Sequence, residues 1–219
     1  MKRYLFMLIL LINLTSFAQG LINDGATITI QSGATLIIDG DASAKLTNLT
    51  NGSYIGKLDN SGIIELEGDW ANLGNKDLNL GLVKFNGSLQ QQISGNNDWG
   101  NIEINNSNGV RVISGNQRLL EIMYQTKGNF ETNDSLTLIS TSSKTALIDG
   151  GLEDGIDGNS SITGKVTVQR YIPGINGYHY LSSPVSDATV SELNDDMTIT
   201  GFGQDYELHQ WSTFWYYDE

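Results

Sequence analysis

Short alternations of apolar and polar residues, interrupted by glycine and asparagine, recur along most of the chain. Residues 25–40 read GATITIQSGATLIIDG, in which Gly-Ala-Thr precedes an alternating segment twice, eight residues apart. The apolar residues of each segment share one parity: Ala26, Ile28 and Ile30 in the first, and Ala34, Leu36 and Ile38 in the second. Because a pleated strand places residues of one parity on one face, the pattern predicts two short strands with one buried face each.

The alternation returns at similar intervals farther along the chain. Apolar pairs stand at Ile64/Leu66, Val83/Phe85 and Ile102/Ile104, 19 residues apart, followed by Leu120/Ile122 after 18 residues and Leu136/Leu138 after 16. A strand repeated at this spacing, with Gly and Asn between the copies, favours a solenoid whose coils bury their apolar faces by stacking. The sequence therefore predicts a right-handed parallel β-helix, with the two Gly-Ala-Thr segments as its first rungs.

The same pattern predicts which side chains point inward. We expect Ile64, Leu66, Val83, Phe85, Ile102 and Ile104 to face the core, and Glu65, Lys84 and Glu103 to face solvent. An antiparallel sandwich would use the same alternation and the same turns, so it remains the alternative topology.

The composition agrees with an all-β protein and limits its partners. The chain has 219 residues, of which 39% are hydrophobic, and it contains 25 glycines and only two prolines. This is enough apolar material for a core, and it favours many short strands joined by turns. The formal net charge of −13 argues against nucleic acid or an anionic membrane as a partner.

The N-terminus has the pattern of a secretory signal peptide over residues 1–18. It reads MKRYLFMLILLINLTSFAQG, with Lys2 and Arg3 before an apolar run and Ser16-Phe17-Ala18 before Gln19. We expect cleavage after Ala18, export, and no transmembrane span after processing, because the run is short for a membrane anchor. There is no cysteine, so the exported chain depends on packing and hydrogen bonds.

Changes in composition predict the domain boundaries. We assign residues 19–148 to the β-helix repeat region, 149–164 to a Gly/Asp-rich linker and 165–219 to a partial C-terminal β unit. Beyond the linker the repeat fades, both prolines appear, and the chain ends in the aromatic run YELHQWSTFWYYDE. This pattern predicts an incomplete β-sandwich-like unit, as in a fragment of a longer protein.

Several phrases resemble a known class of exported proteins. VKFNGSLQQQISGNNDWGNIEINNSNGVRV, followed by GNFETNDSLTLIS, is similar to the β-helical N-terminal regions of large surface proteins exported by type IX secretion. GKVTVQRYIPGINGYHYLSSPVSDATVSEL looks like the segment that follows in those proteins. The resemblance implies a modular, adhesin-like surface protein. Asp134-Ser135-Leu136 resembles the O-glycosylation acceptor of bacteria with this export system, although a turn leading into a strand explains it equally well.

Enzymatic β-helices need a defined set of acidic and basic groups. Lyases use a basic proton abstractor beside calcium-binding carboxylates, and hydrolases use paired carboxylates. The candidates here are isolated in sequence: Arg111 and Arg118 without neighbouring Asp, the pair Asp195-Asp196, and His179 and His209. Residues far apart in sequence could still converge in a solenoid, but the sequence itself predicts no catalytic set.

Two stretches suggest ligands. Residues 149–158, DGGLEDGIDG, place the calcium-type ligands Asp149, Glu153, Asp154 and Asp157 among glycines, but the spacing differs from a calcium-binding loop and also suits a solvated linker. Trp211, Trp215 and Tyr217 could stack on sugars, whereas the alternative is that they fill a sandwich core. Calcium is the only cofactor that the sequence suggests.

These observations predict a non-catalytic secreted or cell-surface repeat protein that acts as a spacer, adhesion module or contact surface. Its partner would be extracellular or on a cell surface, and a polysaccharide fits that setting. The competing hypothesis is a carbohydrate-binding or polysaccharide-degrading β-helix protein.

Overall fold

The computed structural model describes residues 20–40, 43–74, 78–149 and 160–172. Every regular element in these ranges is a strand, which confirms the all-β prediction. The strands are β1 (Leu21–Asp24), β2 (Thr27–Ile30), β3 (Thr35–Ile38), β4 (Leu46–Asn51), β5 (Tyr54–Ile55), β6 (Lys57–Asn60), β7 (Ile63–Leu66), β8 (Trp70–Asn72), β9 (Leu78–Phe85), β10 (Gln91–Gly95), β11 (Asn97–Asn105), β12 (Val110–Val112), β13 (Gln117–Leu119), β14 (Ile122–Lys127), β15 (Asn129–Glu131), β16 (Leu136–Leu138), β17 (Leu147–Asp149), β18 (Ser161–Thr163) and β19 (Val166–Val168).

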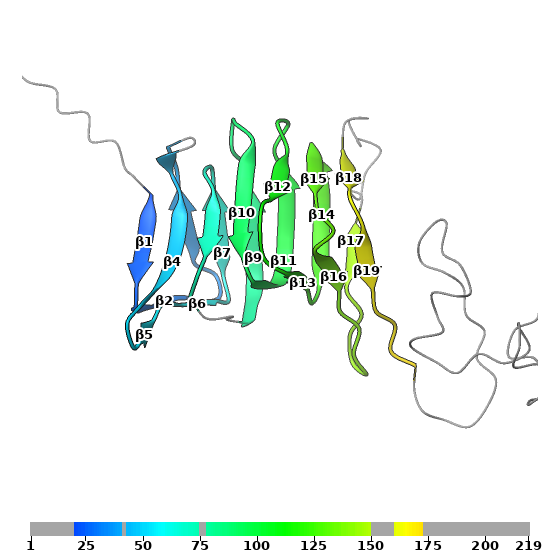
Figure 1. The fold of residues 1–219 in the computed structure, drawn as a ribbon, viewed down its shortest axis with the longest axis horizontal. Coiled ribbons are helices and arrows are strands. Elements are labelled where there is room, and N and C mark those ends of the chain that lie inside the picture. The colour runs from blue at the N-terminus through cyan, green and yellow to red at the C-terminus, as the bar shows by residue number, and fades with distance from the viewer. Residues whose placement is uncertain (1–19, 41–42, 75–77, 150–159, 173–219) are drawn as a thin grey trace, which may run out of the picture. The chain divides into compact units, whose positions relative to one another are not determined.

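Apart from β5, which forms a short antiparallel pair with β4, the strands form parallel ladders between successive coils, as in a β-solenoid (Figure 1). Sheet 1 has the order β1-β4-β8-β10-β12-β15-β18, and sheet 2 has the order β3-β7-β9-β11-β13-β16-β19, with β14 beside β11 and β17 beside β14. Strands β2 and β6 form a third, short sheet. Parallel neighbours cannot be joined by tight hairpins, so the antiparallel sandwich is excluded for this region.

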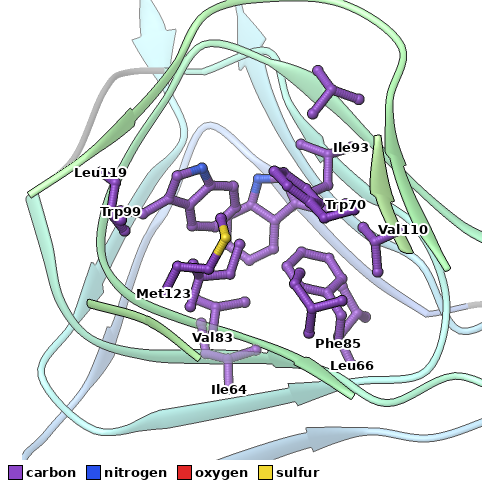
Figure 2. Packing of buried hydrophobic residues seen from close by; sticks show 14 of the residues in the cluster. Ile64, Leu66, Trp70, Val83, Phe85, Ile93, Trp99, Val110, Leu119 and Met123 are labelled. Atoms are coloured by element: carbon purple, nitrogen blue, oxygen red, sulfur yellow. The ribbon is translucent and has the colours of Figure 1, made fainter. Parts of the chain in front are cut away.

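The core consists of the residues that the alternation predicts. Ile64, Val83 and Ile102 stack in register on β7, β9 and β11, and so do Leu66, Phe85 and Ile104. All six side chains are fully buried. Figure 2 shows residues of this wall pointing toward the opposite side of the coil, where Trp70 lies. Each coil therefore contributes one apolar layer to a continuous core.

The charged residues between these positions lie on the outer surface, as predicted. Glu65, Lys84 and Glu103 are in register on neighbouring strands. They are half-buried rather than freely solvated, because each one is flanked by the side chains of adjacent coils. Lys84 and Glu103 also form an ion pair with an Nζ–Oε2 distance of 3.6 Å.

The predicted pair Leu120/Ile122 is wrong. Leu119 and Met123 are fully buried, whereas Leu120 and Ile122 are half-buried. The reason is that the parity of the buried residues changes at the corner before β13. Val110 and Val112 are buried on β12, whereas the buried residues of β13 and β14 have odd numbers, Leu119 and Met123 among them. Met123 stacks on Ile102.

Leu136 and Leu138 are buried as predicted, but they continue a different part of the wall. They pair with Gln117 and Leu119 of β13 rather than with β14. Strand β11 is long enough for its first half to pair with β13 and its second half with β14. A single coil thus contributes two strands to sheet 2 at this level.

The two Gly-Ala-Thr segments are not successive rungs but two sides of one coil. Strand β2 pairs with β6, and β3 pairs with β7. Ile30 and Ile38 are buried and Ile28 and Leu36 half-buried, but the alanines at the start of each segment are exposed. Burial is incomplete because the next coil covers this coil from one side only in the described part of the chain.

The solenoid extends beyond the boundaries expected from the sequence. Asp149, placed in the linker, belongs to β17, and β18 pairs with β15. Val166–Val168, assigned to the C-terminal unit, pairs in parallel with β16. Residues 150–159 and 173–219 lie outside the described residues, and with them most of the expected linker and β-sandwich-like unit.

Glycine is required where one coil turns tightly over another. Gly128 has a φ of 85°, which side chains rarely adopt, and a Cβ there would lie 1.7 Å from the carbonyl oxygen of Asn106 in the preceding coil. A glycine at such a corner allows the backbones of two coils to approach at the spacing of the ladder.

Candidate functional site

An asparagine ladder runs through the interior along sheet 1. Asn23 Nδ2 donates to Asn48 Oδ1 at 2.9 Å, Asn48 Nδ2 donates to Asn72 Oδ1 at 3.0 Å, and Asn72 Nδ2 donates to the carbonyl oxygen of Asn96 at 3.3 Å. Asn48 is fully buried and also donates to the carbonyl oxygen of Gly56 at 2.9 Å. These amides satisfy the backbone at the corners of successive coils, so we assign them a structural role.

A second polar cluster holds the tryptophans inside the core. Trp70 and Trp99 have ring centroids 5.0 Å apart. Trp70 Nε1 donates to Asn97 Oδ1 at 2.7 Å, and Trp99 Nε1 donates to Gln117 Oε1 at 3.0 Å. Both side chains are about 1% exposed, so these two indoles are packing groups rather than a platform for sugars.

The structure brings carboxylates to both arginines that appear isolated in the sequence. Arg118 Nη1 donates to both carboxylate oxygens of Asp98, at 2.9 and 3.2 Å, because β11 and β13 place the two residues in register. Arg111 Nε lies 3.4 Å from Glu131 Oε2 on the neighbouring strand. Residues far apart in sequence thus converge at both arginines, which the sequence left open. Each pair links two adjacent coils.

The outer face of sheet 2 carries two parallel columns of side chains on β3, β7, β9, β11, β14 and β17. The first is mostly aliphatic, and we call it the aliphatic column; it consists of Thr35, Ile63, Leu82, Asn101, Ile122 and Leu147. We call the second the mixed column; it consists of Ile37, Glu65, Lys84, Glu103, Tyr124 and Asp149. Ile37, at one end of the mixed column, is 62% exposed, and Leu147, at the far end of the aliphatic column, is 50% exposed. The aliphatic residues Ile63, Leu82 and Ile122 on the strands between these ends are half-buried. Together the columns form an extended surface along the stack of coils.

The aliphatic column has a signal in the sequence that the alternation of buried residues does not reveal. Ile63, Leu82 and Asn101 recur with the same 19-residue spacing as the buried pairs, but with the opposite parity. Apolar residues at outward positions form a surface feature, and so they do not belong to the buried faces that the alternation predicts.

One carboxylate near this face has a shifted pKa. The Nζ of Lys144 donates to Glu121 and lowers the pKa of that carboxyl below its ordinary value. Partial burial raises the pKa and so opposes this effect, whereas Asn101 donates to Glu121 Oε2 at 3.1 Å and lowers it further. Glu121 is thus held in its ionised form by neighbours from two other segments.

The predicted calcium ligands are only partly covered by the structure. Asp149 is the last residue of β17 and pairs with Tyr124. Glu153, Asp154 and Asp157 lie outside the described residues, as do the sugar-stacking candidates Trp211, Trp215 and Tyr217 and the candidates His179, Asp195, Asp196 and His209. Within the described ranges, no three His, Cys, Asp or Glu side chains are grouped closely enough to hold a metal ion.

The segment Asp134-Ser135-Leu136 forms the turn that leads into β16. Asn133 and Asp134 have positive φ values of 50° and 56°. Ser135 Oγ donates to the carbonyl oxygen of Thr132 at 2.7 Å, and Asp134 Oδ1 accepts a hydrogen bond from the amide of Lys165 at 2.7 Å. These contacts give both polar residues a local structural role.

No known protein family, curated protein or solved structure matches the chain. Among the described residues, no helix is long and apolar enough to cross a membrane.

Proposed function

We propose that the protein is a non-catalytic exported surface protein whose solenoid serves as a spacer and contact surface. The observation that carries this proposal is the use of the charged groups. Arg118 pairs with Asp98 and Arg111 pairs with Glu131, in each case between neighbouring coils. These pairs support a structural use of the charges. A stack with such links can hold an attached module at a distance and present a long side surface.

Export is the second part of the proposal. It is supported by the signal-peptide pattern of residues 1–18 and by the resemblance to cargo of type IX secretion. We expect the mature protein to start at Gln19. Intact-mass measurement of secreted material tests this, and a mature protein that retains Met1 would instead indicate a membrane anchor.

The contact surface in this proposal is the outer face of sheet 2. Leu147→Ser should weaken binding to the cell surface or matrix about tenfold, because a half-exposed leucine contributes about 1 to 2 kcal/mol when a partner covers it. Ile113→Ser is a matched control, since Ile113 is 46% exposed but directly follows β12 of sheet 1. Equal effects of both variants would show that contact is not specific to this face.

The competing function is action on polysaccharides, and it is tested with a panel of acidic and neutral polymers. The proposal predicts no release of unsaturated or reducing ends by the purified protein. If the protein releases such ends and the Arg118→Gln variant does not, the protein is an enzyme and the non-catalytic function is refuted. Binding without release would support a carbohydrate-binding surface, for which Tyr124 in the mixed column is the described aromatic candidate.

A further inference from the structure

Among the described residues, three strands at the N-terminal end of the solenoid each have one edge that pairs with no other strand. Strands β1, β2 and β3 pair with β4, β6 and β7 of the next coil, and each is a terminal strand of its sheet in the described part of the chain. Since all three pair with the following coil, their other edges face the same end of the stack.

The hydrogen-bond pattern identifies the peptide groups at these edges. The carbonyl oxygens of Ala26 and Ile30 accept from Lys57 and Ser61 of the second coil, so alternate residues of β2 are directed toward β6. The residues between them direct their N–H and C=O groups toward the open edge. By the same alternation, the open-edge residues of the three strands are Ile22, Asp24, Thr27, Thr29, Thr35 and Ile37, and all six are exposed.

This edge lacks several of the features that usually prevent strand pairing. Natural edge strands often carry lysine, proline or a bulge. Residues 20–40 contain no lysine, arginine or proline, and their only charged residues are Asp24 and Asp39. Leu21, Ile28 and Leu36 lie only half-buried behind the edge. Within the part of the chain that the structure describes, the first coil thus combines peptide groups without a strand partner, β-branched residues and incompletely covered apolar groups.

We propose that this edge pairs with the same edge of a second copy, giving a head-to-head dimer. The expected cleavage leaves only Gln19 before Gly20, so the leader cannot cover the first coil of the processed chain. A second copy supplies an edge of the same length and the same low charge, and head-to-head docking reverses the strand direction, so the new pairs are antiparallel. The dimer depends on the removal of residues 1–18, and an intact-mass measurement of the processed chain tests that step separately.

Thr29→Pro in the processed chain tests the pairing. Proline removes the N–H that points away from β6, and proline is tolerated on an edge strand, so the β2–β6 ladder should remain. Thr29→Val keeps both the N–H and the β-branched shape and is the matched control. In sedimentation equilibrium, the processed chain and Thr29→Val should dimerise, and Thr29→Pro should weaken the dimer about tenfold or more, since the lost bond occurs in both copies.

Site-specific labels provide a second readout that does not depend on the proline variant. The chain has no cysteine, so Thr27→Cys and Ser142→Cys each introduce one spin-label site, the second in an exposed turn after β16. A head-to-head dimer predicts strong dipolar coupling between Thr27→Cys labels and none between Ser142→Cys labels. A monomeric processed chain would refute the proposal. So would a dimer that Thr29→Pro leaves intact, or one in which only the Ser142→Cys labels are coupled.

Discussion

Truncation of the central asparagine of the interior ladder gives the sharpest test of how the coils are held together. Asn48 is fully buried and makes three hydrogen bonds, to Asn23, Gly56 and Asn72, at 2.9 to 3.0 Å. Each bond contributes about 1 kcal/mol net, so Asn48→Ala should lower the free energy of unfolding by about 3 kcal/mol. Asn48→Asp keeps the shape of the side chain but places a carboxylate oxygen against the oxygen acceptors of Gly56 and Asn72. We therefore expect it to lower the free energy of unfolding at least as much as Asn48→Ala.

The effect should also be local. In a solenoid each coil contacts only its neighbours, so the loss of one rung affects the adjacent coils most. Hydrogen exchange followed by mass spectrometry should show faster exchange in β1, β4 and β8 of Asn48→Ala, with β15 and β16 close to the parent protein. Urea denaturation of the same samples gives the total change in stability.

Thr47→Ala is the control, because Thr47 is the neighbour of Asn48 on the outer side of β4 and is half-buried. Its effect should stay within about 0.5 kcal/mol. A loss below about 1 kcal/mol for Asn48→Ala would show that water or a rearranged neighbour replaces the ladder. A uniform rise in exchange over all coils would refute the local coupling.

Two further predictions concern the core and the charged surface. Phe85→Ala should lower the free energy of unfolding by about 3 to 5 kcal/mol through the cavity it leaves, whereas Lys84→Ala should stay within about 0.5 kcal/mol; similar values in urea denaturation would contradict the assigned inward and outward faces. The folded-state pKa of Glu121 is lowered, so its contribution to stability is present above the ordinary carboxyl pKa and is lost as the pH falls through the lowered value. Lys144→Met should raise that pKa in an NMR titration and reduce the difference in stability between neutral and acidic pH, and an unchanged titration would refute the role of Lys144.

The corners of the coils limit how far the fold can be predicted from sequence. Within a strand, burial follows the two-residue period, and so Ile64, Val83 and Ile102 are identified correctly. Across a corner the parity can change, as it does between Val112 of β12 and Leu119 of β13. The change depends on how many residues the corner uses, and this number is set by the coil beneath it. Rung assignments therefore fail at corners even where the strands themselves are recognised.

The surface features are also only partly predictable from the sequence. The aliphatic column has a sequence signal in the 19-residue spacing of Ile63 and Leu82, but its continuation to Leu147 depends on the pairing of β14 with β17. The contact between Asp98 and Arg118 depends on the register of two strands in neighbouring coils. Nothing within either strand specifies that register.

The sequence by itself determined the all-β class, the stacking of repeated strands and the inward residues of the central coils, because these follow from strand periodicity and from glycine and asparagine at the turns. Only the tertiary structure decided that the ladders are parallel, that the two Gly-Ala-Thr segments are sides of one coil, and that Asn23, Asn48 and Asn72 form one hydrogen-bonded ladder. The physical reason is the distance along the chain over which each kind of interaction acts. Periodicity and turn conformation depend on residues a few positions apart, whereas ladder pairs and the ion pairs between coils join residues about one coil apart, and their register exists only after the coils have stacked.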